Sequence, residues 1–148
     1  MGDILLNPDT LALLKECDSG CKMGTESMEQ IMGFVNNSDL AATIMKYNED
    51  HIKLGEEIHE ILNSAGEQSA EPNLMAKAAS WIQSQVKMMI NGDTHQAASI
   101  LIDGCKMGIK SLNEYKNKYK DADDKTVRIC DKLIKTEQDF MDALQAFL

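Results

Sequence analysis

The sequence has few of the residues that interrupt helices or favour strands. Its 148 residues include only two prolines, and aromatic residues make up 5% of the chain. Leucine, isoleucine, methionine, alanine, lysine and glutamate are plentiful, and these residues favour helices. A chain of this length can bury a substantial core. We therefore predict an all-α protein with a single domain over residues 1–148.

Positive charge is also scarce. The chain has 15 Lys and Arg against 24 Asp and Glu, a formal net charge of -9. Residues 1–75 hold 4 Lys or Arg and 14 Asp or Glu, whereas residues 76–148 hold 11 and 10. Nucleic acids and anionic membranes bind surfaces with excess positive charge, so we expect neither as a partner. The acidic half could attract a basic protein, although ordinary solvated helix faces give the same composition.

Long apolar runs are missing as well. No stretch of about eighteen apolar residues occurs, and the chain does not begin with a secretory type of apolar leader. We expect no membrane span and a cytoplasmic location. The four cysteines would stay reduced in that compartment.

What the sequence does contain is an internal repeat. The residues from Gly20 to Gly24, Gly-Cys-Lys-Met-Gly, return from Gly104 to Gly108, 84 residues later. Because 84 is a multiple of seven, both copies fall on the same face of a helix. Helices predicted over residues 8–36 and 94–120 then carry matching inward seams. The first seam is Leu14, Cys17, Cys21, Gly24, Met28, Ile31 and Val35, and the second is Ala98, Leu101, Cys105, Gly108, Leu112, Tyr115 and Tyr119.

The remaining helices complete two hairpins. Capping residues and apolar periodicity predict helices over residues 39–65, 72–90 and 125–148, with Gly66 ending the first of them. The chain is then a hairpin over 8–65, a crossover helix over 72–90 and a hairpin over 93–148. We predict an up-down-down-up four-helix bundle with an extra crossover helix, its hairpins related by a pseudo-twofold axis. His51 and Glu137 face inward, and Glu137 is the one carboxylate placed in the interior.

Two pairs of glycines lie in the middle of predicted helices. A glycine there destabilises the helix by about 1 kcal/mol relative to alanine, so four of them need a compensating role. Close packing of the helices over residues 8–36 and 94–120 is one explanation, because small side chains let two backbones approach. A pocket for a ligand or a metal is the other.

The predicted architecture resembles the ferritin-like superfamily, and in particular the small bacterial ferritin-like bundles with a rubrerythrin-type hairpin duplication. Membership implies an inward Glu on the first helix of each hairpin and an inward Glu-x-x-His on the second. Glu56 and His59 have this spacing, but the helical phase puts Glu56 on the solvent side. Glu137 has Phe140 where the His would stand. Most of the di-iron ligands are therefore missing, and we do not carry over a ferroxidase or peroxidase activity.

A small set of inward side chains could still bind a metal. Matching levels along each hairpin places His51 beside Cys21, and Glu137 beside Cys105. If the two hairpins meet at the pseudo-twofold axis, these four residues converge, and they are ligands that suit iron or zinc. The alternative is structural, because inward cysteines commonly act as small hydrophobic residues and a His51–Glu137 pair would satisfy a buried carboxylate.

The residues support two different functions. The sequence lacks a Ser-His-Asp arrangement, a phosphate-binding loop, a Cys-x-x-Cys pair and a His-Glu-x-x-His motif, so no catalytic residues are assigned. We expect a non-catalytic binding or assembly protein, with a second copy or another protein as its partner. The alternative is a metal-binding or redox protein with an atypical site formed by His51, Glu137, Cys21 and Cys105.

Overall fold

The computed structural model describes residues 5–67 and 72–148, except the side chains of residues 72–77. Every regular element in these residues is helical, which confirms the all-α prediction. The elements are α1 (Pro8–Met32), α2 (Ser38–Ser64), α3 (Pro72–Val86), α4 (Thr94–Lys118), α5 (Asp124–Leu144) and the short 3-10 helix η1 (Gln145–Phe147). None of the described helices combines the length and the apolarity that crossing a bilayer requires.

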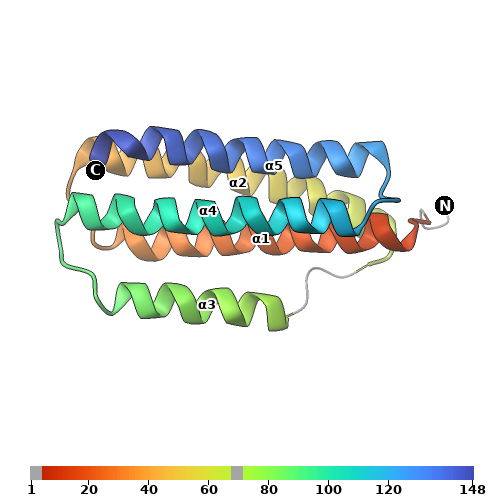
Figure 1. Ribbon diagram of the computed structural model, residues 1–148, viewed down its shortest axis with the longest axis horizontal. Helices are drawn as coiled ribbons and strands as arrows, with labels where there is room; N and C mark the ends of the chain where they lie inside the picture. The colour runs from red at the N-terminus through yellow and green to blue at the C-terminus, as the bar shows by residue number, and fades with distance from the viewer. Residues whose placement is uncertain (1–4, 68–71) are drawn as a thin grey trace.

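Four long helices form a bundle, and α3 lies outside it (Figure 1). α1 packs against α2 and α4 against α5, and the two hairpins meet through contacts of α1 with α4 and of α2 with α5. Along the chain the four long helices run up, down, down and up, because α3 carries the chain back along the bundle (Figure 1). α3 itself packs against α1.

Side-chain caps fix the starts of the four long helices. In each case a side-chain oxygen of the N-cap residue accepts a hydrogen bond from the backbone N–H three residues later, at 2.8 or 2.9 Å. This satisfies one of the free N–H groups of the first turn. The caps are Asn7, Asn37, Asp93 and Asp123.

The end of α2 follows the prediction. Gly66 has a φ of 71°, the left-handed conformation that glycine adopts without strain. Its N–H donates to the carbonyl of Asn63, and the N–H of Glu67 donates to the carbonyl of Leu62 at 2.8 Å. These two bonds make a Schellman motif, which satisfies carbonyl groups that the last helical turn leaves free.

Four helices end two or more residues earlier than predicted. α1 stops at Met32 rather than residue 36, α3 at Val86 rather than residue 90, α4 at Lys118 rather than residue 120, and α5 at Leu144 rather than residue 148, where η1 follows it. The residues that follow α1 and those that follow α3 hydrogen-bond each other instead of extending their helices. The N–H of Gly92 donates to the carbonyl of Phe34 at 2.8 Å.

A single amide side chain also holds the chain between α3 and α4 out of a helix. Gln96 accepts a hydrogen bond from the N–H of Ile90 and donates one to the carbonyl of Met88, both at 2.8 Å. The spacing of Asp93 and Gln96 in the sequence predicts a capping box, and only half of that motif forms. Asp93 caps α4 as expected, but Gln96 binds the preceding loop instead of the backbone N–H of Asp93.

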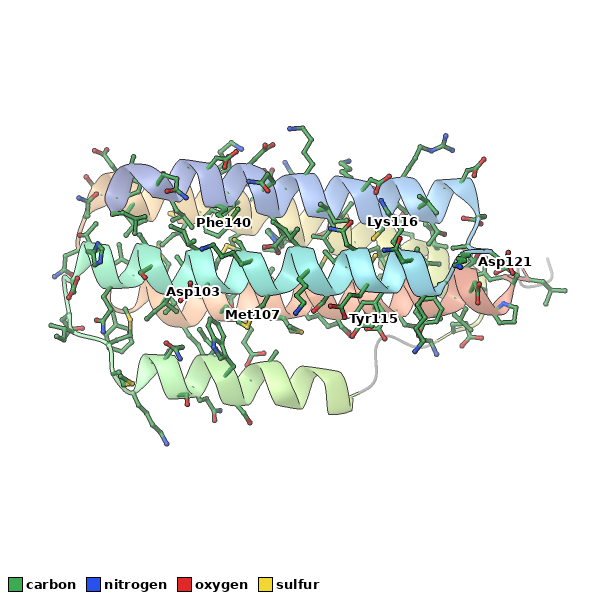
Figure 2. All side chains as sticks on the ribbon, viewed as in Figure 1. Asp103, Met107, Tyr115, Lys116, Asp121 and Phe140 are labelled. Atoms are coloured by element: carbon green, nitrogen blue, oxygen red, sulfur yellow. The ribbon has the colours of Figure 1, made fainter. Side chains whose placement is uncertain are left out.

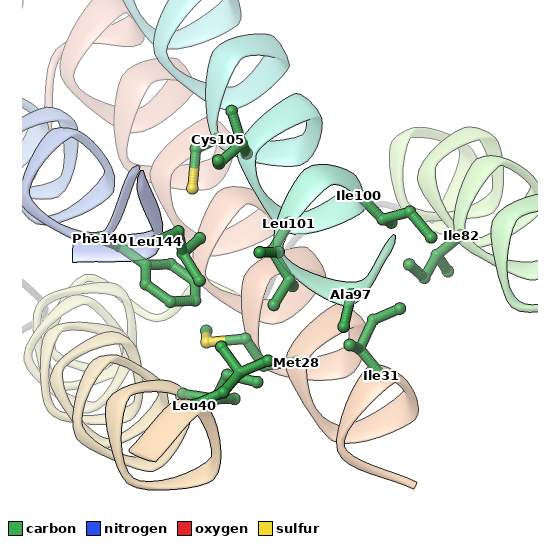
Figure 3. Packing of buried hydrophobic residues seen from close by; sticks show 13 residues of the cluster. Met28, Ile31, Leu40, Ile82, Ala97, Ile100, Leu101, Cys105, Phe140 and Leu144 are labelled. Atoms are coloured by element: carbon green, nitrogen blue, oxygen red, sulfur yellow. The ribbon is translucent and has the colours of Figure 1, made fainter. Parts of the chain in front are cut away.

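The core consists of two clusters of buried apolar residues. One cluster joins α3 to the bundle: Ile82 faces Ile100 of α4, while Leu101, Phe140 and Leu144 fill the space between the long helices (Figure 3). The other surrounds Leu14, Leu54, Leu112 and Leu133. On α2 and α5 the residues between the two clusters include His51 and Glu137, so a polar pair separates two apolar layers.

Candidate functional site

His51 and Glu137 meet at the centre of the bundle. The Nε2 atom of His51 lies 2.8 Å from Oε1 of Glu137, and Nδ1 lies 2.6 Å from the carbonyl oxygen of Tyr47. The residues are 1% and 7% exposed. Helical periodicity predicts that both side chains point inward, and the structure confirms this.

These contacts determine the charge of His51. A backbone carbonyl only accepts hydrogen bonds, so Nδ1 must donate to Tyr47, and Nε2 then donates to the Glu137 carboxylate. Burial lowers the pKa of His51, but the hydrogen bond and charge of Glu137, helped by the Tyr47 carbonyl, raise it above its ordinary value overall. The raised pKa favours the protonated imidazole, and both ring nitrogens of His51 are occupied.

Two glycines of the repeat face this pair, and one of them makes room for it. A Cβ atom on Gly24 would lie 2.8 Å from Cδ2 and 3.1 Å from Nε2 of His51, closer than side chains approach. At the matching position of the second copy, a Cβ atom on Gly108 would lie 3.6 Å from Cδ of Glu137. The two repeats therefore present equivalent positions to the two members of the ion pair.

The other two glycines face different neighbours. A Cβ atom on Gly20 would lie 3.3 Å from Leu133, and one on Gly104 would lie 3.6 Å from the Trp81 ring. No glycine of one copy has the other copy among these nearest neighbours. Gly20 does face α4, because its Cβ atom would also lie 3.9 Å from Leu112, but the glycines of the two copies do not pack on each other.

All four glycines line a pocket of about 300 Å³ between α1, α3 and α4. This volume lies at the lower end of the range for small-molecule sites. The pocket reaches inward to His51 and Glu137, and its outer lining includes Met107, which is 43% exposed. Figure 2 labels Met107 and Tyr115 of α4 on the side of the bundle where α3 runs beside α1. The walls are mostly apolar, with Met23, Met28, Trp81, Ile100, Leu112 and Phe140 among them.

A second carboxylate lines the same pocket. Glu16 of α1 hydrogen-bonds Tyr115 of α4, and both residues are part of the lining. Burial raises the pKa of Glu16, although the Tyr115 hydrogen bond and the charge of Lys118 oppose the rise. Within residues 5–67 and 78–148, no donor hydrogen-bonds the buried Oε2 atom of Glu16. The sequence pattern does not single out Glu16, because its place depends on how α4 packs on α1.

The four predicted metal candidates lie at one level of the bundle. The Cys105 thiol hydrogen-bonds Glu137, and Cys21 is near enough for the Glu137 charge to act on it. Burial, followed by that negative charge, raises the pKa of Cys105, while burial and the charges of Asp18 and Glu137 raise the pKa of Cys21. Both thiols therefore stay protonated. In the described part of the chain, no group of three or more His, Cys, Asp or Glu residues is placed to hold a metal ion.

A buried carboxylate on α1 was not predicted. Asp18 is fully buried, so the prediction that Glu137 is the one interior carboxylate is wrong. Lys22 forms an ion pair with Asp18 at 3.0 Å, and Nε2 of His59 lies 2.7 Å from Oδ1 of Asp18. The signal was present in the sequence, because Asp18 follows the inward Leu14 by one helical turn and precedes Lys22 by another.

Comparison with known proteins identifies no relative. No protein family model matches the chain, and neither a curated protein nor a solved structure matches it.

Proposed function

We propose that this chain is a non-catalytic binding protein that holds a small, mainly apolar molecule in the pocket between α1, α3 and α4. The observation that carries the proposal is the placement of four mid-helix glycines around one pocket. Each of them destabilises its helix by about 1 kcal/mol relative to alanine, and at Gly108 and Gly104 a Cβ atom would meet only ordinary contacts. Open space for a ligand gives those two glycines a role that packing does not.

The ion pair supports binding rather than acid-base catalysis. A general base needs a free nitrogen or oxygen within reach of the substrate. Both nitrogens of His51 are engaged, one with Tyr47 and one with Glu137. The pair is best suited to fix the inner wall of the pocket.

We also propose that the bundle is a ferritin-like arrangement without the di-iron ligands. The directions of the four long helices support this (Figure 1). Glu56 is exposed, and Phe140 stacks on Tyr47 with ring centroids 4.9 Å apart. The position that follows Glu137 by three residues is therefore occupied by a packed aromatic ring instead of a ligand.

Trp81 is the chain's single tryptophan and lines the pocket, so its fluorescence tests the binding role directly. Octan-1-ol titrated into the protein should change the emission of Trp81 saturably. A Gly108→Leu variant should lose this response because the new side chain fills the pocket. Lys110→Leu adds the same bulk at an exposed position of α4 outside the pocket and should keep it. An equal response from both variants would contradict the proposal.

A metal site is the second candidate: the His51–Glu137 contact and the neighbouring Cys105 supply ligand types that suit iron or zinc, although the described residues hold no group of three such side chains placed around one ion. Elemental analysis of protein purified without an affinity tag tests it. Stoichiometric iron or zinc that disappears in a His51→Ala, Glu137→Ala double variant would support the metal site over the binding role. Metal-free protein whose melting temperature ignores a chelator would contradict it.

A further inference from the structure

We propose that the ligand of this pocket is an organic cation, with an amine or amidine group joined to an apolar body. This rests on the binding role proposed above and adds the chemical class of the ligand. The charge of the pocket lining, the state of Glu16 and the aromatic rings of the wall each point to it.

The charged side chains of the lining are mainly negative. Glu16 and Glu137 are both part of it, whereas none of the described lining residues is Lys or Arg. His51 is the one cationic group, and both of its N–H donors are already used within the bundle. An anionic ligand would meet carboxylates with no free cationic donor to pair with. A cationic ligand would instead meet carboxylate oxygens that can accept its hydrogen bonds.

Glu16 has a buried oxygen atom that lacks a hydrogen-bond donor. Its Oε2 atom is buried and accepts no hydrogen bond from the described residues, although Tyr115 binds the side chain. A buried acceptor without a donor is unfavourable, and more so when it is charged. Lys118 acts on Glu16 through its charge but is not part of the pocket lining. An ammonium group in the pocket would supply the missing donor and the compensating charge together.

The wall suits the rest of such a molecule. Trp81, Tyr115 and Phe140 bring three aromatic rings to the lining. The face of an aromatic ring attracts a cation, and its area packs against an alkyl or aryl body. Methionine side chains line the remaining space and adapt to different shapes.

The test compares three probes with the same alkyl chain: octylammonium, octan-1-ol and octanoate. Trp81 fluorescence titrations give the dissociation constant of each. We expect octylammonium to bind at least about tenfold tighter than octan-1-ol, and octanoate to bind weakest, because a hydrogen bond to a charged partner is worth about this factor. Glu16→Gln should remove most of the advantage of octylammonium. Glu114→Gln removes an exposed carboxylate of α4 outside the lining and should leave all three constants unchanged.

The outcomes separate this inference from the binding role. Equal binding of the three probes, or an octylammonium constant that Glu16→Gln does not change, would overturn the cation and leave the binding role in place. Absence of any saturable response to all three probes would overturn both proposals.

Discussion

The ion pair of His51 and Glu137 should make a large contribution to stability that depends on pH. Glu137→Ala leaves the His51 imidazole buried without its carboxylate partner, because the residue is 1% exposed and Nε2 donates to Oε1 at 2.8 Å. Removing one member of a buried, hydrogen-bonded pair costs about 3–5 kcal/mol. For a domain of this size, this corresponds to a fall in melting temperature of roughly 6–20 °C.

The pH dependence identifies the pair more specifically than the size of the loss. The pKa of His51 is raised on folding, so the folded protein binds more protons than the unfolded chain above the ordinary histidine pKa of about 6.5. The contribution of the pair is therefore fully present below about pH 6.5. It is lost as the pH rises through the folded pKa.

The milder variant Glu137→Gln should change the sign of this dependence. Burial, which lowers the pKa of His51, is the largest single influence on that group, and the opposing influence of Glu137 is removed in the variant. Unfolding then takes up a proton, so this contribution to stability should rise with pH up to about 6.5. Urea unfolding at a series of pH values measures the free energy of unfolding of both proteins. Glu60→Gln, which removes an exposed carboxylate from α2, provides the control.

One result would refute this reasoning. If the free energy of unfolding of Glu137→Gln keeps the same pH dependence as the unmodified chain and as Glu60→Gln, His51 does not owe its charge to Glu137. A loss below about 1 kcal/mol in Glu137→Ala would lead to the same conclusion, because a loss this small is typical of exposed ion pairs.

Three further predictions concern the surroundings of the pair. Gly24→Ala should lower the free energy of unfolding by about 1–2 kcal/mol, because the new methyl group collides with the His51 ring. Gly108→Ala should leave the free energy of unfolding unchanged or raise it by up to about 1 kcal/mol. Urea unfolding compares the two variants, and equal effects would contradict the assigned contacts. Asp18→Ala should cost about 1–2 kcal/mol, since Lys22 and His59 lose their carboxylate partner but keep access to solvent, while the same change at exposed Asp103 should cost less than about 0.5 kcal/mol in thermal melts. All four cysteines are buried, so a thiol reagent at pH 8 should label no cysteine in the folded protein and four cysteines after denaturation. Rapid labelling without unfolding would show that the core is open.

Local features of the sequence predict the helices and their inward faces well. The N-caps Asn7, Asn37 and Asp93 depend only on neighbouring residues, and Gly66 ends α2 as predicted. The inward position of His51 follows in the same way from the periodicity of its own helix. Patterns of this kind survive folding because each is decided within a turn or two of the chain.

Features that depend on contacts between distant segments were not predictable. α3 ends early because Gln96, ten residues beyond its last residue, binds the backbone of the intervening loop. The pocket exists because Trp81 of α3 lies against Gly104 of α4, and the sequence alone does not set that distance. Asp18 is a different case: its helical phase pointed inward, but charged residues are rarely fully buried, and its contacts with Lys22 and His59 compensate for its burial.

The divergence of the two repeats explains how a polar pair can occupy the centre of this bundle. Gly24 and Gly108 occupy equivalent positions in the two copies, and the groups that they accommodate meet at 2.8 Å. If two like groups met at this contact, two imidazolium ions or two carboxylates would face each other, and one of each pair would lose its charge. With His51 against Gly24 and Glu137 against Gly108, each group stabilises the charge of its partner. The 84-residue offset of the repeat matches His51 with Lys135 rather than with Glu137, so the two hairpins bring different residues to this contact and give the pocket a charged inner wall.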